Sequence, residues 1–442
     1  MTVTTSESVD QGLDPTKPLV VVSADTHIGP RLREELRPYC PQAHLEAFDE
    51  HVAELDAKKA ESGGLMGFGG MKREGNWTVS RRNLETEGHF DVHARLRDLD
   101  KDGVAGEIVF HDSQNGEPLP FDRTSLFDRD NGSEPFEQMA VGRHIYNRWL
   151  ADVCSVEPER HIGLVQLPIW DIDASVKELE WAREAGLRGI NFPFTRGYMS
   201  SYNNPEWEPL FAAAEDLGMQ LCHHGGGAPS VTGGPGATSI LKLELASRSR
   251  YSPLSHLMFG GVFEQHPNLH LILTESVGPW WSHVMWELDS IYHHDGAEYP
   301  DFWKRVPRLP SEYAAEQVFI GASFLARFEA EDAIANGYAR NVIWGSDYPH
   351  FEGTFQHGIE FEGEPVSRVA QRFTLAGLPP EPVADILGRN AIRAYGFDGP
   401  ALEAVAERIG APSFDDVSRP LDGLPDPHER GHHSFRTFGF WY

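Results

Sequence analysis

Eight short apolar, β-branched segments recur along this 442-residue chain. Helical patterns separate most of them, and strands that alternate with helices predict parallel βαβ units. Eight such units favour a closed α/β barrel, the (β/α)8 or TIM barrel, with an open doubly wound sheet as the alternative. The expected strands are Leu19–Ala24, Gly106–Phe110, His161–Gln166, Gly189–Phe192, Met219–Cys222, Leu269–Thr274, Gln317–Gly321 and Asn341–Trp344.

Two of the connecting helices carry clear boundary signals. From Asp173 to Gly186 the apolar residues follow helical spacing, and the glycine is a natural C-terminal stop. Before the fifth expected strand, Asn204 can cap a helix that begins at Pro205 and ends at Gly218. These signals predict one helix before the fourth strand and another before the fifth.

The expected barrel domain covers residues 19–397, after a flexible N-terminus over residues 1–18. A long insertion after the first strand, at about residues 29–100, exceeds a minimal barrel unit. Its glycine-rich but apolar middle, residues 63–70, predicts a mobile lid over the site, with a disordered surface loop as the alternative.

A C-terminal extension is expected over residues 398–442. It ends in aromatic residues that are costly to leave in water, so we expect it to dock on the barrel or on a neighbouring subunit. These residues are Phe435, Phe438, Phe440, Trp441 and Tyr442.

The charge balance limits the possible partners. With 38 Lys and Arg against 67 Asp and Glu, the formal net charge is −29, which argues against nucleic acid and anionic membrane surfaces. No apolar run approaches the roughly 20 residues of a membrane helix, and the N-terminus has no signal-peptide core. Cys40, Cys154 and Cys222 form no disulfide framework. We therefore expect a cytoplasmic protein with a small-molecule substrate. We also expect a homo-oligomer, a dimer or higher.

Metal-capable side chains stand at the C-terminal ends of four expected strands. The C-terminal ends of parallel barrel strands meet at one rim, so these side chains should converge. Carboxylate and imidazole groups together suit a divalent metal. The residues are Asp25 and His27 after the first strand, His223 and His224 after the fifth, Glu275 after the sixth and Asp347 after the eighth.

Strand periodicity decides which of these side chains share a face. Asp25 and His27 are two residues apart and should point to the same side. Only one of the adjacent His223 and His224 should face inward, and we favour His224, which directly precedes the glycines where the strand becomes a loop. The other histidine would pack in the core or stand behind the ligands.

The chain resembles the amidohydrolase superfamily, in particular family 2 with its aminocarboxymuconate-semialdehyde decarboxylase-like enzymes. The resemblance extends from about Leu19 to Phe397. It is carried by Asp25-Thr-His27, His224 before the glycines at 225–227, Gly345-Ser-Asp-Tyr-Pro-His350 and the closing segment 386–396.

The resemblance implies that Asp25, His27, His224 and Asp347 bind one divalent metal, Zn²⁺ first, with Mn²⁺ or Fe²⁺ as alternatives. Binuclear members of the superfamily carry a bridging lysine at the end of strand four. Residues 187–193 contain no lysine, so a single metal is expected.

Asp347, Glu275 and His224 are the expected catalytic residues. Asp347 is placed to move a proton. Glu275 stands where the family often has the histidine that decarboxylation uses, which favours a hydrolase whose metal-activated water attacks a C–O or C–N bond of a small, aromatic or carboxylated substrate. The alternatives are a non-oxidative decarboxylase of an aromatic or enol carboxylic acid, and a barrel that binds a ligand without turnover.

Four further residues are candidates for contact with substrate, each with a structural alternative. His350 follows the Asp347 motif and could instead brace its loop, and His223 could pack in the core. Arg196 could pair with a substrate carboxylate, as could Lys242 and Arg248, or all three could be solvated. Trp280, beside Trp281, could wall an aromatic pocket or pack on the next helix.

Overall fold

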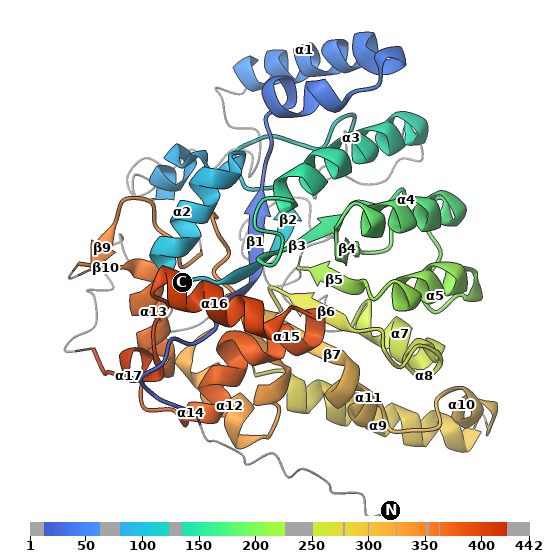
Figure 1. Cartoon of the computed structure of the whole chain (residues 1–442). Helices are drawn as coiled ribbons and strands as arrows, with labels where there is room; N and C mark the ends of the chain where they lie inside the picture. The colour runs from blue at the N-terminus through green and yellow to red at the C-terminus, as the bar shows by residue number, and fades with distance from the viewer. Residues whose placement is uncertain are drawn as a thin grey trace, which may run out of the picture.

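Eight parallel strands form one sheet whose spatial order follows the chain order from β1 to β8. The computed structural model describes residues 13–61, 80–122, 135–225, 251–276, 279–298, 300–323, 325–350, 353–361 and 363–421. The strands lie at the centre with helices around them (Figure 1). Their bounds are β1 (Val22–Ile28), β2 (Gly106–His111), β3 (His161–Val165), β4 (Gly189–Asn191), β5 (Gln220–His224), β6 (Leu271–Thr274), β7 (Val318–Ala322) and β8 (Val342–Trp344).

Backbone hydrogen bonds between β1 and the segment after β8 close the sheet. The Asp347 N–H donates to the carbonyl of Asp25 at 2.9 Å, and the His27 N–H donates to the carbonyl of Tyr348 at 2.5 Å. A closed ring of parallel strands with outer helices is the (β/α)8 barrel. The expected fold is therefore confirmed, and the open-sheet alternative is wrong.

All eight expected strands are present, but the first extends further than its apolar run. The run ends at Ala24, whereas β1 continues to Ile28 because its pairing with β2 continues past a bulge between Ser23 and Thr26. The Asp25-Thr-His27 motif therefore lies inside a strand, where backbone pairing fixes both side chains.

The helices and short turns of helix follow the strands in alternation. The insertion after β1 contains η1 (Leu32–Leu36), η2 (Arg37–Tyr39), η3 (Gln42–His44), α1 (Leu45–Glu61), η4 (Ser80–Glu85), η5 (Glu87–His89) and α2 (Val92–Asp102). The barrel helices are α3 (Phe136–Cys154), α4 (Ile172–Glu184), η6 (Pro205–Trp207), α5 (Glu208–Asp216), α7 (Leu254–Gly260), α8 (Val262–Gln265), α9 (Trp281–Glu298), α10 (Pro300–Arg305), α11 (Pro310–Gln317), α12 (Arg327–Ala335) and η7 (Ala339–Asn341).

After β8 the chain forms a small hairpin and a further group of helices. They are β9 (Glu360–Phe361), β10 (Glu364–Pro365), α13 (Val366–Leu375), α14 (Pro380–Ala384), η8 (Asp385–Arg389), α15 (Asn390–Tyr395), α16 (Gly399–Ile409) and α17 (Phe414–Val417). Among the residues that the structure describes, no helix is both long enough and apolar enough to cross a membrane.

Both helices with boundary signals are present, with one adjustment each. The side chain of Asn204 caps its helix by accepting from the Glu206 N–H, and the first turn is the 3₁₀ segment η6 before α5 begins. The earlier helix, α4, is capped by Asp171 rather than starting at Asp173.

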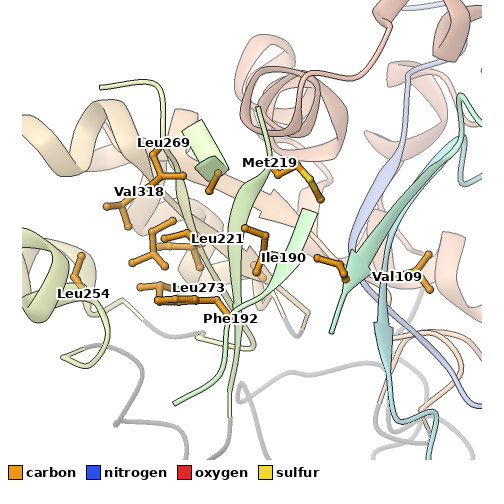
Figure 2. Close-up of a cluster of buried hydrophobic side chains, with 14 of the residues drawn as sticks. Val109, Ile190, Phe192, Met219, Leu221, Leu254, Leu269, Leu273 and Val318 are labelled. Atoms are coloured by element: carbon orange, nitrogen blue, oxygen red, sulfur yellow. The ribbon is translucent and has the colours of Figure 1, made fainter. Parts of the chain in front are cut away.

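Apolar side chains fill two regions, outside and inside the sheet. Between strands and helices lie residues such as Ile190, Leu221 and Leu273 (Figure 2). Inside the barrel the alternate residues of the strands meet, which leaves no open pore. The inner residues include Val22, Ile108, Ile162, Leu164, Cys222, Ile272, Phe319 and Ile343, with Phe397 and Leu402 packed against them.

Part of the expected C-terminal extension belongs to this packing, because Leu402 of α16 contacts the inner cluster. The division of the chain at residue 397 remains a prediction. The expected lid at residues 63–70 and the aromatic terminus at residues 435–442 lie outside the described residues.

Candidate metal centre

Two carboxylates and two imidazoles meet at the C-terminal rim of the barrel. Nε2 of His27 lies 3.0 Å from Oδ1 of Asp25 and 3.3 Å from Oδ1 of Asp347. Nε2 of His224 lies 3.6 Å from the same Asp25 oxygen. Asp25, His27 and Asp347 are at most 3% exposed. The structure thus brings together all four residues expected to hold a metal, from β1, β5 and the end of β8.

Backbone carbonyls orient the imidazoles of this site. Nδ1 of His27 lies 2.9 Å from the carbonyl oxygen of His111, and Nδ1 of His224 lies 2.8 Å from that of Gly225. A carbonyl can only accept, so each Nδ1 carries a proton and each Nε2 is the nitrogen that a cation would meet, in place of a second proton. This is the arrangement in which a second partner fixes the tautomer of a metal-binding histidine.

Several polar atoms of these four side chains are not satisfied by a hydrogen bond, although they lie close together. Within the described part of the chain, Oδ1 of Asp25, both oxygens of Asp347 and Nε2 of His27 and of His224 have no hydrogen-bond partner. Buried polar atoms are rarely left so, because each costs free energy unless something satisfies it. Carboxylate oxygens and imidazole lone pairs that converge in this way suit a divalent cation.

Opposite charges dominate the electrostatics of the site. Burial would lower the pKa of His27, but the Asp25 carboxylate outweighs it and raises that pKa to about 10. Burial also opposes the charge on His224, yet Glu275 and Asp25 raise its pKa to about 10. Burial would raise the pKa of Asp347, but His350 and His27 hold it below its usual value. The negative field that favours these protons would equally favour a cation.

Glu275 and His350 stand beside the four central residues. Oε2 of Glu275 lies 3.7 Å from Nδ1 of His224. One carboxylate oxygen of Glu275 also lies within 4.8 Å of a carboxylate oxygen of Asp25 and of one of Asp347. The His350 ring stacks on His27 with centroids 3.7 Å apart. Its Nε2 lies 2.6 Å from the carbonyl of Asp112, and its Nδ1 lies 3.0 Å from Oδ1 of Asp347.

Glu275 and Asp347 both adopt left-handed backbone conformations, with φ of 55° and 56°. Such a conformation costs a non-glycine residue about 1–3 kcal/mol and tends to occur at functional sites. Here it turns the chain at the ends of β6 and β8, where the two carboxylates approach Asp25.

The remaining candidates lie away from the four central side chains. His223 is fully buried on the other face of β5, where its Nδ1 donates to the carbonyl of Phe192 at 2.8 Å and its ring packs on Phe194. Trp280 is buried and donates to the carbonyl of Ser276 at 2.7 Å. Arg196 lies in the segment after β4, half-buried. Lys242 and Arg248 lie outside the described residues.

Three groups that support the site were missed from the sequence. The Ser323 hydroxyl donates to Oδ2 of Asp25. Arg95 donates to the carbonyl of His27 at 2.6 Å and pairs with Glu107 on β2. The Asn83 amide donates to the carbonyl of His350 at 3.1 Å. Only Glu107 gave a sequence signal, as a charged residue within an otherwise apolar strand.

Comparison with known proteins identifies the family of this chain. Residues 90–397 match the family model described as amidohydrolase. The 2-amino-3-carboxymuconate-6-semialdehyde decarboxylase of Dictyostelium discoideum is 24% identical over 323 residues, which cover 70% of this chain and 77% of that protein. The gamma-resorcylate decarboxylase of Rhizobium sp. (strain MTP-10005) is 26% identical over 227 residues, or 46% of this chain. That match spans 64% of the relative, just under two thirds of its length.

A solved structure shows the same fold. The 5-carboxyvanillate decarboxylase of Novosphingobium aromaticivorans, complexed with manganese and 4-hydroxy-3-methoxy-5-nitrobenzoic acid, has a TM-score of 0.56 and 16% identity. The likeness covers 87% of this chain and 98% of that one.

These relatives correct one expectation drawn from the sequence. Glu275 in place of a histidine favours hydrolysis on sequence grounds, but the similar proteins are decarboxylases, and the hydrolase interpretation is wrong. The two chemistries use the same kinds of metal ligand, so a single changed residue beside the ligands does not separate them.

Proposed function

The chain belongs to the amidohydrolase family, and on that premise we propose that it is a metal-dependent, non-oxidative decarboxylase of an aromatic or enol carboxylic acid. The observation that carries the proposal is the convergence of Asp25, His27, His224 and Asp347, whose facing atoms have no hydrogen-bond partner in the described residues. The decarboxylases among its relatives support the choice of reaction.

Asp25, His27, His224 and Asp347 would hold one divalent ion, Zn²⁺ or Mn²⁺. Mixed carboxylate and imidazole donors accept both ions, and a solved relative contains manganese. When bound, the ion supplies a positive charge that attracts the substrate's carboxylate and a neighbouring hydroxyl oxygen.

In the proposed reaction Asp347, which its lowered pKa leaves ionised at rest, carries a proton from His350 to the substrate carbon that bears the carboxylate. The bond between that carbon and the carboxylate then breaks, its electron pair returns to the ring or enol system, and CO₂ leaves. His350, with Nδ1 3.0 Å from Asp347, returns a proton from solvent to Asp347. Glu275 adds a further negative charge beside His224 and supports the charged imidazole when no cation is present.

We also propose that the protein is a cytoplasmic homo-oligomer that acts on a small molecule rather than on a nucleic acid or a membrane. The acidic composition, with a formal net charge of −29, supports a protein that meets neither nucleic acid nor anionic membranes.

The proposal is tested with purified protein that is stripped of metal and then reloaded with Zn²⁺ or Mn²⁺. Reloaded protein should contain one ion per chain and release CO₂ from members of a hydroxybenzoic acid panel, leaving the corresponding phenol. Asp347→Asn should lower kcat by about 10²–10⁴-fold, the usual contribution of a positioned proton donor. Asp56→Asn is the matched control, because the Asp56 side chain lies on the surface and is 54% exposed. Metal-loaded protein that releases no CO₂ from any member would contradict the proposal.

A further inference from the structure

A second polar group lies at the barrel rim, on the side formed by β3 and β4. Leu164 and Gly189 are register partners with Leu164 inside the barrel, so the next pair, Gln166 and Asn191, also faces inward. The Asn191 amide donates to Oε1 of Gln166 at 2.9 Å. These two residues form a polar pair among the inward-facing residues beside β5, which carries His224.

The Gln166 side chain is held with both N–H donors of its amide nitrogen unused in the described part of the chain. Its backbone is fixed twice by Asn147 of α3, which accepts from the Gln166 N–H and donates to its carbonyl, both at 2.9 Å. Gln166 is 6% exposed, and its Nε2 has no hydrogen-bond partner within the described residues. A buried amide nitrogen held in this way is costly unless a ligand accepts from it.

A buried cation lies one helical turn closer to the rim. Arg143 precedes Asn147 by four residues and so shares its face of α3. It is 13% exposed, and its contacts are long: 3.4 Å to the Asp122 carboxylate and 3.3 Å to the carbonyl of Met139. Its guanidinium lies over the ring of Trp170, 4.5 Å from the centroid, in the segment after β3.

Two charged groups act on the Arg143 guanidinium, the Asp122 carboxylate and the guanidinium of Arg196. Burial lowers the pKa of Arg143, Asp122 opposes that effect, and the nearby guanidinium of Arg196 adds to it. Two guanidinium groups close enough to repel each other would be stabilised by an added anion.

We propose that Gln166 and Arg143 form a second anion subsite, which holds a second carboxylate of the substrate while the reacting carboxylate lies at the metal centre. The inference rests on the proposed function and narrows its substrate class to aromatic dicarboxylic acids.

The spacing of the strands fits such a substrate. β1 and β3 are separated by β2, so their ends are two strand spacings, about 10 Å, apart. Phe110 of β2 fills the position between them, and its ring centroid lies 5.7 Å from that of His27 and 5.0 Å from that of His224. A substrate ring that packs on Phe110 would place one carboxylate towards each end.

The test measures binding separately from turnover. Calorimetry of the Mn²⁺-loaded full chain compares benzoate with benzene-1,3-dicarboxylate, neither of which carries the hydroxyl group of the proposed substrates. The dicarboxylate should bind at least about tenfold more tightly, the worth of one hydrogen bond to a charged group. Arg143→Gln and Gln166→Leu should each remove most of that preference and leave benzoate binding nearly unchanged. Arg183→Gln, on the exposed face of α4, is the control and should keep it.

Equal affinity of the wild-type protein for the two ligands, or no binding of either, would overturn the subsite. So would a preference that survives both substitutions. Hydroxylated forms of the two acids then test the reaction itself. A preference for the dicarboxylate without CO₂ release would refute the proposed function but leave the subsite. CO₂ release without that preference would refute the subsite but leave the proposed function.

Discussion

The hydroxyl of Ser323, at the end of β7, donates a hydrogen bond to Oδ2 of Asp25 on β1. The other oxygen of the same carboxylate, Oδ1, faces His27 and His224. One oxygen is therefore anchored by the protein, and the other is directed at the metal centre. Both residues are fully buried, so water does not compete with the serine hydroxyl for Oδ2 of Asp25.

Ser323→Ala should weaken metal binding by about 10–100-fold, the usual effect of removing a partner behind a metal ligand. The Asp25 carboxylate would lose the donor that orients it. The dissociation constant is measured by competition with a chelator, and the fold is monitored by circular dichroism. Ser290→Ala serves as control, because this exposed hydroxyl donates only to its own helix. An unchanged dissociation constant would show that Ser323 does not position Asp25.

Asn83 joins the insertion after β1 to the loop that carries Asp347. Its amide donates to the carbonyls of His350 and Phe355 and accepts from the N–H of His357. The side chain is 2% exposed, so Asn83→Ala would remove three hydrogen bonds and leave the Phe355 carbonyl without this donor, whereas the His350 carbonyl keeps the Gly353 N–H. We expect the free energy of unfolding to fall by about 2–4 kcal/mol.

Urea titration checks this prediction. Asn336→Ala is the matched control, since Asn336 is exposed and bonds only within its own turn of helix. If the two variants lost the same stability, the insertion would not be bracing this loop.

The sequence predicted the strands and the convergence of the four central side chains because both follow local rules. Alternation placed Asp25 and His27 on one face, and the glycines after His224 indicated which of two histidines lies inward. The supporting groups follow no such rule. Ser323 meets Asp25 across 298 residues of chain and Asn83 meets His350 across 267, and nothing near either residue in sequence specifies the encounter.

The choice of reaction was wrong for a related reason. It rested on the identity of one side chain, Glu275, whereas the reaction depends on how the ligands, the proton donor and the substrate pocket fit together. Even the direction of Glu275 required the structure, because its left-handed backbone turns the residue out of the regular strand.

Arg95 and Glu107 form a fully buried ion pair beside β1, the strand that carries Asp25 and His27. Nη2 of Arg95 lies 2.6 Å from Oε2 of Glu107, and Thr26 and His161 also bond to this carboxylate. Removing one partner leaves an uncompensated buried charge, so Arg95→Met should cost about 3–5 kcal/mol of unfolding free energy. The double variant with Glu107→Leu should lose much less than the sum of the two single variants. A double-mutant cycle in urea measures the coupling, and additive losses would contradict the pairing.

Asp102, at the end of α2, should make stability depend on pH. Burial, and then the neighbouring Asp98, raise its pKa from 3.8 to about 7, although Ser367, Arg368 and Lys101 oppose the shift. A raised carboxyl pKa means that the folded state favours the protonated form. Its contribution is therefore complete below about pH 4 and is lost as pH rises through about 7.

Asp102→Asn keeps the shape of the protonated side chain but cannot ionise. Relative to this variant, the wild-type protein should lose roughly 2–4 kcal/mol of unfolding free energy between pH 4 and 8, as a shift of this size implies. Urea titrations at intervals over that range give the difference curve. Asp216→Asn, on the surface of α5, should run parallel to the wild type throughout. A wild-type curve that stays parallel to that of Asp102→Asn would mean that the Asp102 carboxyl ionises normally and that its burial carries no penalty.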